Sequence, residues 1–435
     1  MLAGPPRLLS LVSVALLFGL AWWYLNLVQN PPTATAGSGV SNNGAGLNLD
    51  TSPAPAGGGA TKPGTGTGKA KPLPIGRPYQ GDPLDFGIAI RFTEPVAKPP
   101  GSTYSHIMVV PKTMKEDITW MDREIPDTPK IVYEVDNPDA ENKVPQNKGR
   151  EAMVYLTYII DHYDKLPDTV LFMHAHRFAW HNNILQGQDS VRMIKSLNHE
   201  RIARLGYMNV RCHHEPGCPD WIHMDRPGGD FDFFKKPEEI HWRRHIWEEL
   251  HPGAPIPPSL SGVCCAQFAV TGDRIRQIPL ERFIHYRKWL LTTTMDDQFS
   301  GRIFEYIWHY IFTGHEVYCP AQNTCYCDGY GICFGGRQNY TDYNDKQDER
   351  NKLFEELDVY QKKEAEAEKE GRKVEWDDRQ KKRIEELRGL VHKMDPELER
   401  LRNEALERGK DAKARQEETE NWSSEKIWEY MPKNG

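Results

Sequence analysis

A short buried strand that runs into a cluster of histidines is the feature that most constrains the fold of this chain. Residues 169–173 form a largely apolar run after a Leu-Pro-Asp turn, which is typical of a buried strand. His174, His176 and His181 follow this run closely. Because ligands of open α/β sheets bind at the carboxyl ends of the strands, these histidines lie where a functional site is expected.

The segments around this strand alternate between strand and helix patterns. We predict earlier strands at 107–110 and 130–136, then a helix over 152–163, where apolar residues recur at helical spacing. Such alternation favours a parallel sheet with right-handed crossovers. We therefore predict an α/β domain over residues 86–337, with a Rossmann-like mixed sheet flanked by helices. Later elements are expected as strands at 206–212 and 262–270, and as helices at 190–205, 241–249, 275–291 and 299–312.

The sequence pattern of the first 85 residues indicates an anchor and a stalk rather than a folded domain. Residues 8–28 carry no charge and, at a rise of ~1.5 Å per residue, span ~31 Å, which is enough to cross a bilayer core. We expect a cytosolic tail at 1–7 and an uncleaved signal-anchor at 8–28, although Ala-Thr-Ala at 34–36 offers a cleavage site. Residues 29–85 are rich in Pro, Gly, Ala, Ser and Thr, which predicts a disordered stalk.

The cysteines indicate the compartment of the domain. All eight lie between Cys212 and Cys333, and an even count in a lumenal chain predicts disulfides whose pairing the sequence leaves open. For the adjacent Cys264 and Cys265 we expect separate disulfides. Together with two glycosylation sequons, these features predict a single-pass membrane glycoprotein facing the lumen of the Golgi or the endoplasmic reticulum.

The chain changes character after residue 337. Residues 338–435 are dominated by charged residues and Gln, which predicts a charged helical or disordered tail. We favour a solvated helix there over a short coiled coil, because Pro396 interrupts the apolar seam. The whole chain has a net charge of -7 with interspersed signs, so a nucleic-acid partner is not expected. The seam consists of Ile384, Leu387, Val391, Met394, Leu398 and Leu401.

Several blocks carry a family resemblance. They include Asn-Lys-Gly-Arg-Glu at 147–151, Leu-Pro-Asp at 166–168, the histidine block at 172–181 and Cys-Cys-Ala-Gln-Phe at 264–268. Over roughly residues 105–335 the chain resembles the domain-of-unknown-function family 3431, known mainly from fungal, often membrane-anchored proteins, which implies no activity. The order of elements is also similar to the nucleotide-binding half of GT-A glycosyltransferases. An anchor followed by a stalk resembles Golgi glycosyltransferases as well.

The second resemblance implies a nucleotide-sugar donor, a glycan acceptor and a divalent metal ion. In GT-A enzymes an Asp-x-Asp triplet after the strand binds the metal and the donor phosphates, whereas this chain has histidines there. His174 and His176 point to the same side of an extended chain, and His181, His213 and His214 are the candidates for a third ligand. Imidazoles suit zinc, copper or iron rather than magnesium. The alternative is that the histidines form local hydrogen bonds.

Carboxylates and arginines near residue 300 are the candidates for catalysis. We expect Asp297 or Glu305 to act as general base on an acceptor hydroxyl, and Arg302 to bind phosphate. The alternative is helix capping together with an Arg302–Glu305 ion pair. The other expected substrate-binding residues are Asn147, Lys148 and Glu151, in a loop before a helix, and Trp180, which stacks on a sugar ring or lies in the core.

Two other functions compete with sugar transfer. A strand ending in His-x-His also occurs in metal-dependent hydrolase barrels, but a barrel needs about eight strand–helix repeats, and we find too few. A membrane-anchored binding or scaffold protein without catalysis is the alternative to either enzyme. The sequence does not predict the oligomeric state.

Overall fold

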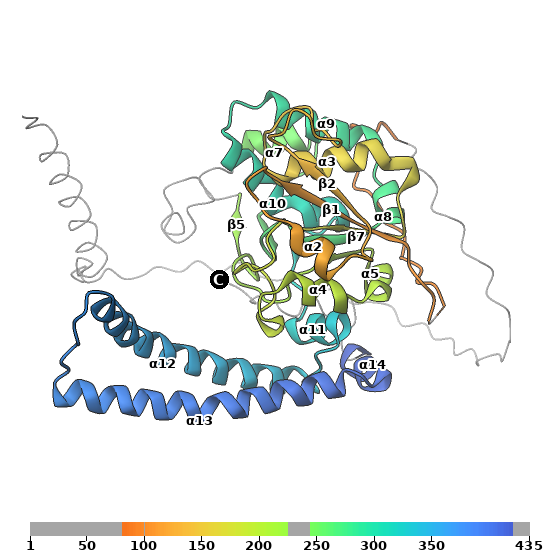
Figure 1. Ribbon diagram of the computed structural model, residues 1–435. Helices are drawn as coiled ribbons and strands as arrows, with labels where there is room; N and C mark the ends of the chain where they lie inside the picture. The colour runs from red at the N-terminus through yellow and green to blue at the C-terminus, as the bar shows by residue number, and fades with distance from the viewer. Residues whose placement is uncertain (1–80, 100, 225–243, 421–435) are drawn as a thin grey trace, which may run out of the picture. The chain divides into compact units, whose positions relative to one another are not determined.

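The computed structural model describes residues 81–99, 101–224 and 244–420 (Figure 1). The predicted cytosolic tail, the predicted anchor at 8–28 and nearly all of the predicted stalk lie outside these residues. Among the helices that are described, none is both long and apolar enough to cross a membrane.

A five-stranded mixed sheet forms the centre of the domain, with the strand order β2-β1-β3-β7-β4. The strands β1 (His106–Lys112), β2 (Lys130–Glu134) and β3 (Thr169–Phe172) are parallel to one another. β7 (Phe268–Thr271) runs antiparallel both to β3 and to β4 (Tyr207–Asn209). All four residues of β3 are buried, as a continuous apolar run requires in a strand covered on both faces. The predicted mixed α/β class is therefore confirmed.

A smaller sheet and a set of helices complete the fold. The smaller sheet has the order β5-β6-β8, from β5 (Ile222–His223), β6 (Ser259–Gly262) and β8 (Val317–Tyr318). The described helices of the α/β domain are α2 (Thr119–Glu124), α3 (Glu151–His162), α4 (Ser190–Ser196), α5 (His199–Leu205), α7 (Arg244–Leu250), α8 (Gly272–Arg276), α9 (Leu280–Thr292), α10 (Asp297–Thr313) and α11 (Gln322–Tyr330), with 3-10 turns η1 (Tyr163–Lys165) and η2 (Ile184–Gln186).

The two faces of the large sheet have separate hydrophobic cores, because successive side chains of a strand point to opposite sides. Val170 and Phe172 of β3 belong to the core under α3, α9 and α10. Leu171 and the following Met173 belong to the core shared with α4, α5 and α11. Figure 1 shows these two groups of helices on either side of the strands. The sheet is therefore a middle layer with helices on both faces.

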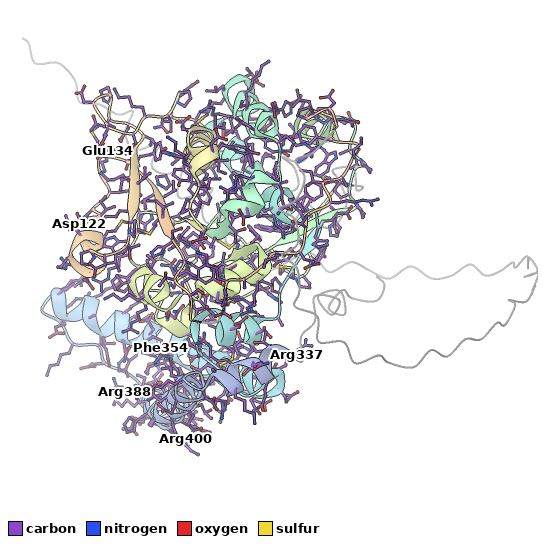
Figure 2. The ribbon with its side chains drawn as sticks, turned by 90° about the vertical axis from the view of Figure 1, so that its right-hand side faces the viewer. Asp122, Glu134, Arg337, Phe354, Arg388 and Arg400 are labelled. Carbon is purple, nitrogen blue, oxygen red and sulfur yellow. A yellow bond between two sulfur atoms is a disulfide. The ribbon has the colours of Figure 1, made fainter. Side chains whose placement is uncertain are left out.

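The charged C-terminal region folds into an antiparallel hairpin of α12 (Arg337–Lys369) and α13 (Asp378–Arg408), followed by α14 (Ala412–Glu420) (Figure 1). Leu387 is fully buried in a small core between the two long helices, so the apolar seam is covered rather than solvated. Further along α13, Leu398 joins the second core of the α/β domain. Charged side chains such as Arg388 and Arg400 remain exposed on the hairpin (Figure 2).

Four disulfides involve all eight cysteines. Our expectation of separate disulfides for Cys264 and Cys265 is wrong, because these neighbours pair with each other. The backbone turns sharply there, with φ of +85° at Cys265 and +47° at Ala266. Four disulfides indicate an oxidising, extracytoplasmic compartment. The other pairs are Cys212–Cys325, Cys218–Cys319 and Cys327–Cys333.

Candidate functional site

Loops from several elements meet at the carboxyl edge of β1, β2 and β3. The histidine loop leaves β3 at this edge, and the chain that follows β2 returns there to begin α3 at Glu151. Because β7 is antiparallel to β3, its amino end with the Cys264–Cys265 disulfide lies at the same edge. Residues that are distant in sequence therefore converge at the place where α/β sheets bind their ligands.

A close contact between two glycines holds the 147–151 loop against α10. Gly149 has a φ of +72°, a conformation that favours glycine. A Cβ atom on Gly301 of α10 would lie only 3.0 Å from the carbonyl oxygen of Gly149, so a larger residue would push the loop away. Asp297 accepts a hydrogen bond from the N–H of Arg150 at 3.3 Å. The side chains of α10 are thereby brought beside the start of α3.

Glu151 and Glu305 form a pair of neighbouring carboxyl groups at this edge. The N–H of Cys265 donates a hydrogen bond to Oε1 of Glu305 at 2.7 Å, and Nε of Arg302 lies 3.9 Å from Oε2. Burial, and then the negative charge of Glu305, raise the pKa of Glu151 to about 7. A carboxyl group with a pKa near neutrality can both accept and release a proton at physiological pH. Glu151 therefore has the protonation behaviour of a general acid or base.

His174 and His181 form a second pair. Nδ1 of His174 lies 3.1 Å from Nε2 of His181, and the two rings meet edge to face. Burial lowers the pKa of His174 to about 3 and that of His181 to about 4, so both imidazoles are neutral at physiological pH. Nε2 of His174 is buried and has no hydrogen-bond partner among the described residues. The exposed His176 instead points to Glu116, at 3.2 Å.

The donor atoms at this edge do not complete a metal site. Two nitrogen ligands of a tetrahedral zinc ion, each ~2.0–2.1 Å from the metal, lie ~3.3 Å apart, so the His174–His181 pair has a suitable spacing for two ligands. Catalytic zinc sites have three protein ligands. Within the described ranges, His176 does not join this pair, and the groups of three potential ligands that do occur contain disulfide-bonded cysteines.

Trp180 lies at the exposed rim of the site, with 62% of its surface accessible. The guanidinium of the buried Arg211 lies 5.4 Å from the centre of its ring and donates to its backbone carbonyl at 3.3 Å. The ring also meets His181 edge to face. Burial lowers the pKa of Arg211 to about 10. Trp180 is thus an exposed aromatic ring that contacts Arg211 and His181, and it does not belong to the core.

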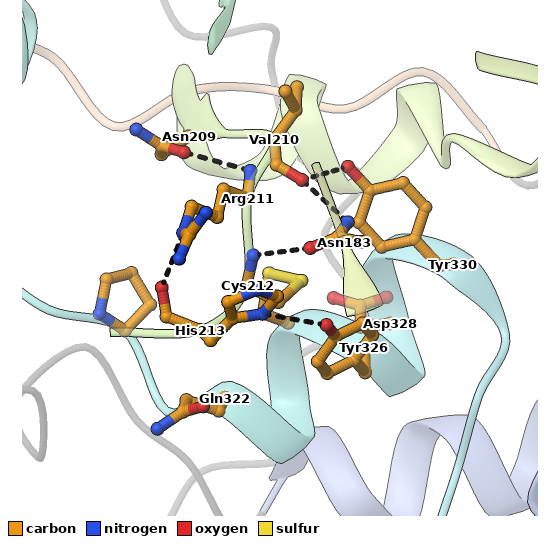
Figure 3. The surroundings of a disulfide bond; sticks show 12 residues. Asn183, Asn209, Val210, Arg211, Cys212, His213, Gln322, Tyr326, Asp328 and Tyr330 are labelled. Atoms are coloured by element: carbon orange, nitrogen blue, oxygen red, sulfur yellow. Dashed lines mark hydrogen bonds between the residues drawn. A yellow bond between two sulfur atoms is a disulfide. The ribbon is translucent and has the colours of Figure 1, made fainter. Parts of the chain in front are cut away.

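The segment that carries Arg211 is fixed from several sides (Figure 3). Arg211 donates to the carbonyl of His213 at 3.4 Å, and the N–H of Cys212 donates to Asn183 at 2.8 Å. The Cys212–Cys325 disulfide and a 2.9 Å contact between His213 and the hydroxyl of Tyr326 tie the same segment to α11. Arg211, which packs against Trp180, therefore belongs to a segment that the Cys212–Cys325 disulfide holds in place.

The remaining predicted residues occupy the loop before α3. Lys148 donates a hydrogen bond to the carbonyl of Thr293, so it ties the loop to the chain before α10. Asn147 is exposed at the rim. Sequence reasoning missed Arg211, which no local pattern distinguishes, and the N–H of Cys265. The Cys-Cys pair inside the predicted strand at 262–270 was the available signal for the latter.

The comparisons with known proteins assign a family. The family described as "Protein of unknown function (DUF3431)" matches residues 108–328, which is just over half of the chain and includes the carboxyl-edge site. No curated protein and no solved structure matches the chain. The chain therefore belongs to the DUF3431 family.

Proposed function

We propose that this domain transfers a sugar from a nucleotide-sugar donor to a glycan acceptor. The observation that carries the proposal is the Glu151–Glu305 pair at the carboxyl edge of the sheet, where Glu151 has a pKa of about 7. Sugar transfer needs a base that removes the proton of an acceptor hydroxyl at neutral pH. A carboxylate whose pKa has the usual value is a weaker base. Burial beside a second carboxyl group raises the pKa and so makes the carboxylate a stronger base.

The reaction follows from these groups. The carboxylate of Glu151 takes the proton of the acceptor hydroxyl, whose oxygen attacks the anomeric carbon of the donor sugar. The bond from that carbon to the phosphate oxygen breaks, and the electron pair leaves with the nucleoside diphosphate. Arg150 and Arg302 stand beside the carboxyl pair and would stabilise the developing phosphate charge. Asp297 keeps the loop in place through Arg150.

Two further observations support a sugar substrate and a GT-A-like arrangement. Trp180 offers an exposed ring at the rim, and an aromatic face of this kind packs against the apolar face of a sugar. The parallel strands β1 to β3, with an antiparallel β7 beside β3, support a GT-A-like arrangement with the candidate site at the carboxyl edge. The four disulfides are consistent with a lumenal domain, and we propose the Golgi or the endoplasmic reticulum as its location and residues 8–28 as its single membrane span.

The divalent metal remains a separate proposal. His174 and His181 would hold it, with the exposed His176 as the third ligand after leaving Glu116. A bound metal would supply positive charge for the donor phosphates. Metal analysis of the purified full-length protein tests this directly. Binding that survives the His174→Ala/His181→Ala double substitution would reject the assignment.

The test of sugar transfer uses the full-length protein and a panel of nucleotide sugars. We expect one donor to raise the melting temperature and to be consumed, and we expect Glu151→Gln to abolish consumption while donor binding remains. Glu281→Gln, which alters an exposed carboxylate on α9, is the matched control and should retain full activity. If no nucleotide sugar binds or reacts, the proposal fails and a non-catalytic binding or scaffold role replaces it.

A further inference from the structure

A cavity of about 430 Å³ lies at the amino edge of the large sheet. It is lined by residues 86–95, by Leu205 just before β4, and by parts of α8, α9 and the end of α10. α8 follows the carboxyl end of β7, which is antiparallel and so ends at the amino edge of its neighbour β3. Glu151, His174 and Glu305 do not line the cavity. It is therefore separate from the candidate site.

Aromatic side chains form part of the wall of this cavity and are held in place by arginines. Phe86 and Phe92 form one wall, each under a guanidinium group at 4.4 Å, from Arg282 and Arg274 respectively. Arg282 also donates to the carbonyls of Pro83 and Asp85 at 2.9 and 2.8 Å, which ties the N-terminal segment to α9. A volume of this size falls in the range of ~300–1,000 Å³ that small-molecule sites occupy.

Arg274 is the polar group at this cavity whose charge lacks a close partner. Its side chain is buried, and Nη1 donates to the carbonyl of Phe312 at 3.1 Å. Nε has no hydrogen-bond partner, and no carboxylate forms an ion pair with Arg274 in the part of the chain that is described. Glu94, which also lines the cavity, acts on Arg274 only through longer-range attraction. A buried guanidinium without a paired anion is unfavourable.

The other arginines that line the cavity already have partners. Arg204 is already paired with Asp328 at 2.7 Å, and Arg282 is engaged by backbone carbonyls. His251 is buried among aromatic rings, and both of its ring nitrogens have no hydrogen-bond partner within the described residues. The cavity thus combines aromatic residues with one buried guanidinium, that of Arg274, which has no close anionic partner among the described residues.

We propose that this cavity binds a small amphipathic anion, whose carboxylate or phosphate pairs with Arg274 and whose apolar part packs against Phe86, Phe92 and Tyr286. The anion supplies the charge that Arg274 lacks, and the aromatic walls bury its apolar part. The ligand is bound at the edge of the sheet opposite the carboxyl pair. This inference does not depend on sugar transfer.

The test measures binding of three probes to the full-length protein in nanodiscs by calorimetry. The probes are 3-phenylpropanoate, phenyl phosphate and the uncharged 3-phenylpropan-1-ol. We expect one of the two anions to bind at least about tenfold more tightly than the alcohol, as one charge-assisted hydrogen bond allows. The stronger of the two anions identifies a carboxylate or a phosphate as the preferred group.

Two variants and one control decide the outcome. Arg274→Gln should weaken anion binding at least about tenfold and leave the alcohol unchanged. Ala89→Trp fills the rim from an exposed position and should block all three probes without lowering the melting temperature. Glu305→Gln, at the other site, should not change the anion affinity. The proposal is overturned if neither anion binds, if the alcohol binds equally well, if Ala89→Trp leaves binding intact, or if Glu305→Gln alters it.

Discussion

Replacing Glu151 with Gln should increase stability at alkaline pH while it abolishes activity. The pKa of this carboxyl group rises from the ordinary value of 4.5 in the unfolded chain to about 7 in the folded protein. The folded state therefore holds the proton more tightly, and the contribution of Glu151 to stability is lost as pH rises through this interval. At ~1.4 kcal/mol per pKa unit, the loss has an upper limit of ~3 kcal/mol and is complete above pH ~7.

Gln carries no charge at any pH, so the Glu151→Gln variant avoids this loss. We expect the variant to be more stable than the wild type by up to ~3 kcal/mol at pH 8, and to differ little at pH 4.5, in urea unfolding followed by tryptophan fluorescence. Glu281→Gln, at an exposed position, should show no such pH dependence. An equal effect of Glu151→Gln at both pH values would refute the assignment of a raised pKa to this group.

Three further perturbations probe other parts of the molecule. Below pH 6.5 the His174–His181 pair should lower the stability of the wild type, because both residues are held neutral in the fold with pKa values of about 3 and 4, and the double His→Gln variant should lack this contribution in the same urea titration. Glu418→Ala removes the acceptor of hydrogen bonds from Asn323 and Gly335, at 3.1 and 2.9 Å, and should cost ~2–3 kcal/mol of unfolding free energy, whereas the exposed Glu407→Ala should cost little. Leu387→Ala should remove ~2–5 kcal/mol from the core of the hairpin, visible as faster hydrogen exchange in α12 and α13 but not in β3.

The central sheet was predictable because its strands carry strong local signals. The apolar run of β3 and the turn before it indicate a buried strand whatever the rest of the chain does. The hairpin was predictable only in part. The seam of α13 follows a heptad pattern, but its partner α12 has only a few apolar residues, such as Leu353 and Leu357, in a highly charged sequence. Which helix packs against α13 depends on the tertiary fold, and the sequence of α13 alone does not predict it.

The site was predictable in its location but not in its pairings. Order along the chain places histidines after a buried strand, whereas the pairing of His174 with His181 depends on how the loop turns back. The pKa of Glu151, about 7, depends on its burial and then on the charge of Glu305, which belongs to a helix far along the chain. The Cys264–Cys265 disulfide depends on positive φ angles at Cys265 and Ala266, which neither residue type favours.

The pH dependence of kcat/KM for sugar transfer by the full-length protein is the most direct test of the proposed role of the carboxyl pair. The Glu151–Glu305 pair predicts that kcat/KM rises with pH through an apparent pKa near 7, as Glu151 loses its proton. Glu151→Gln should remove both the activity and this transition. Activity that persists in Glu151→Gln with an unchanged pH profile would contradict the proposal that the Glu151–Glu305 pair is the catalytic base.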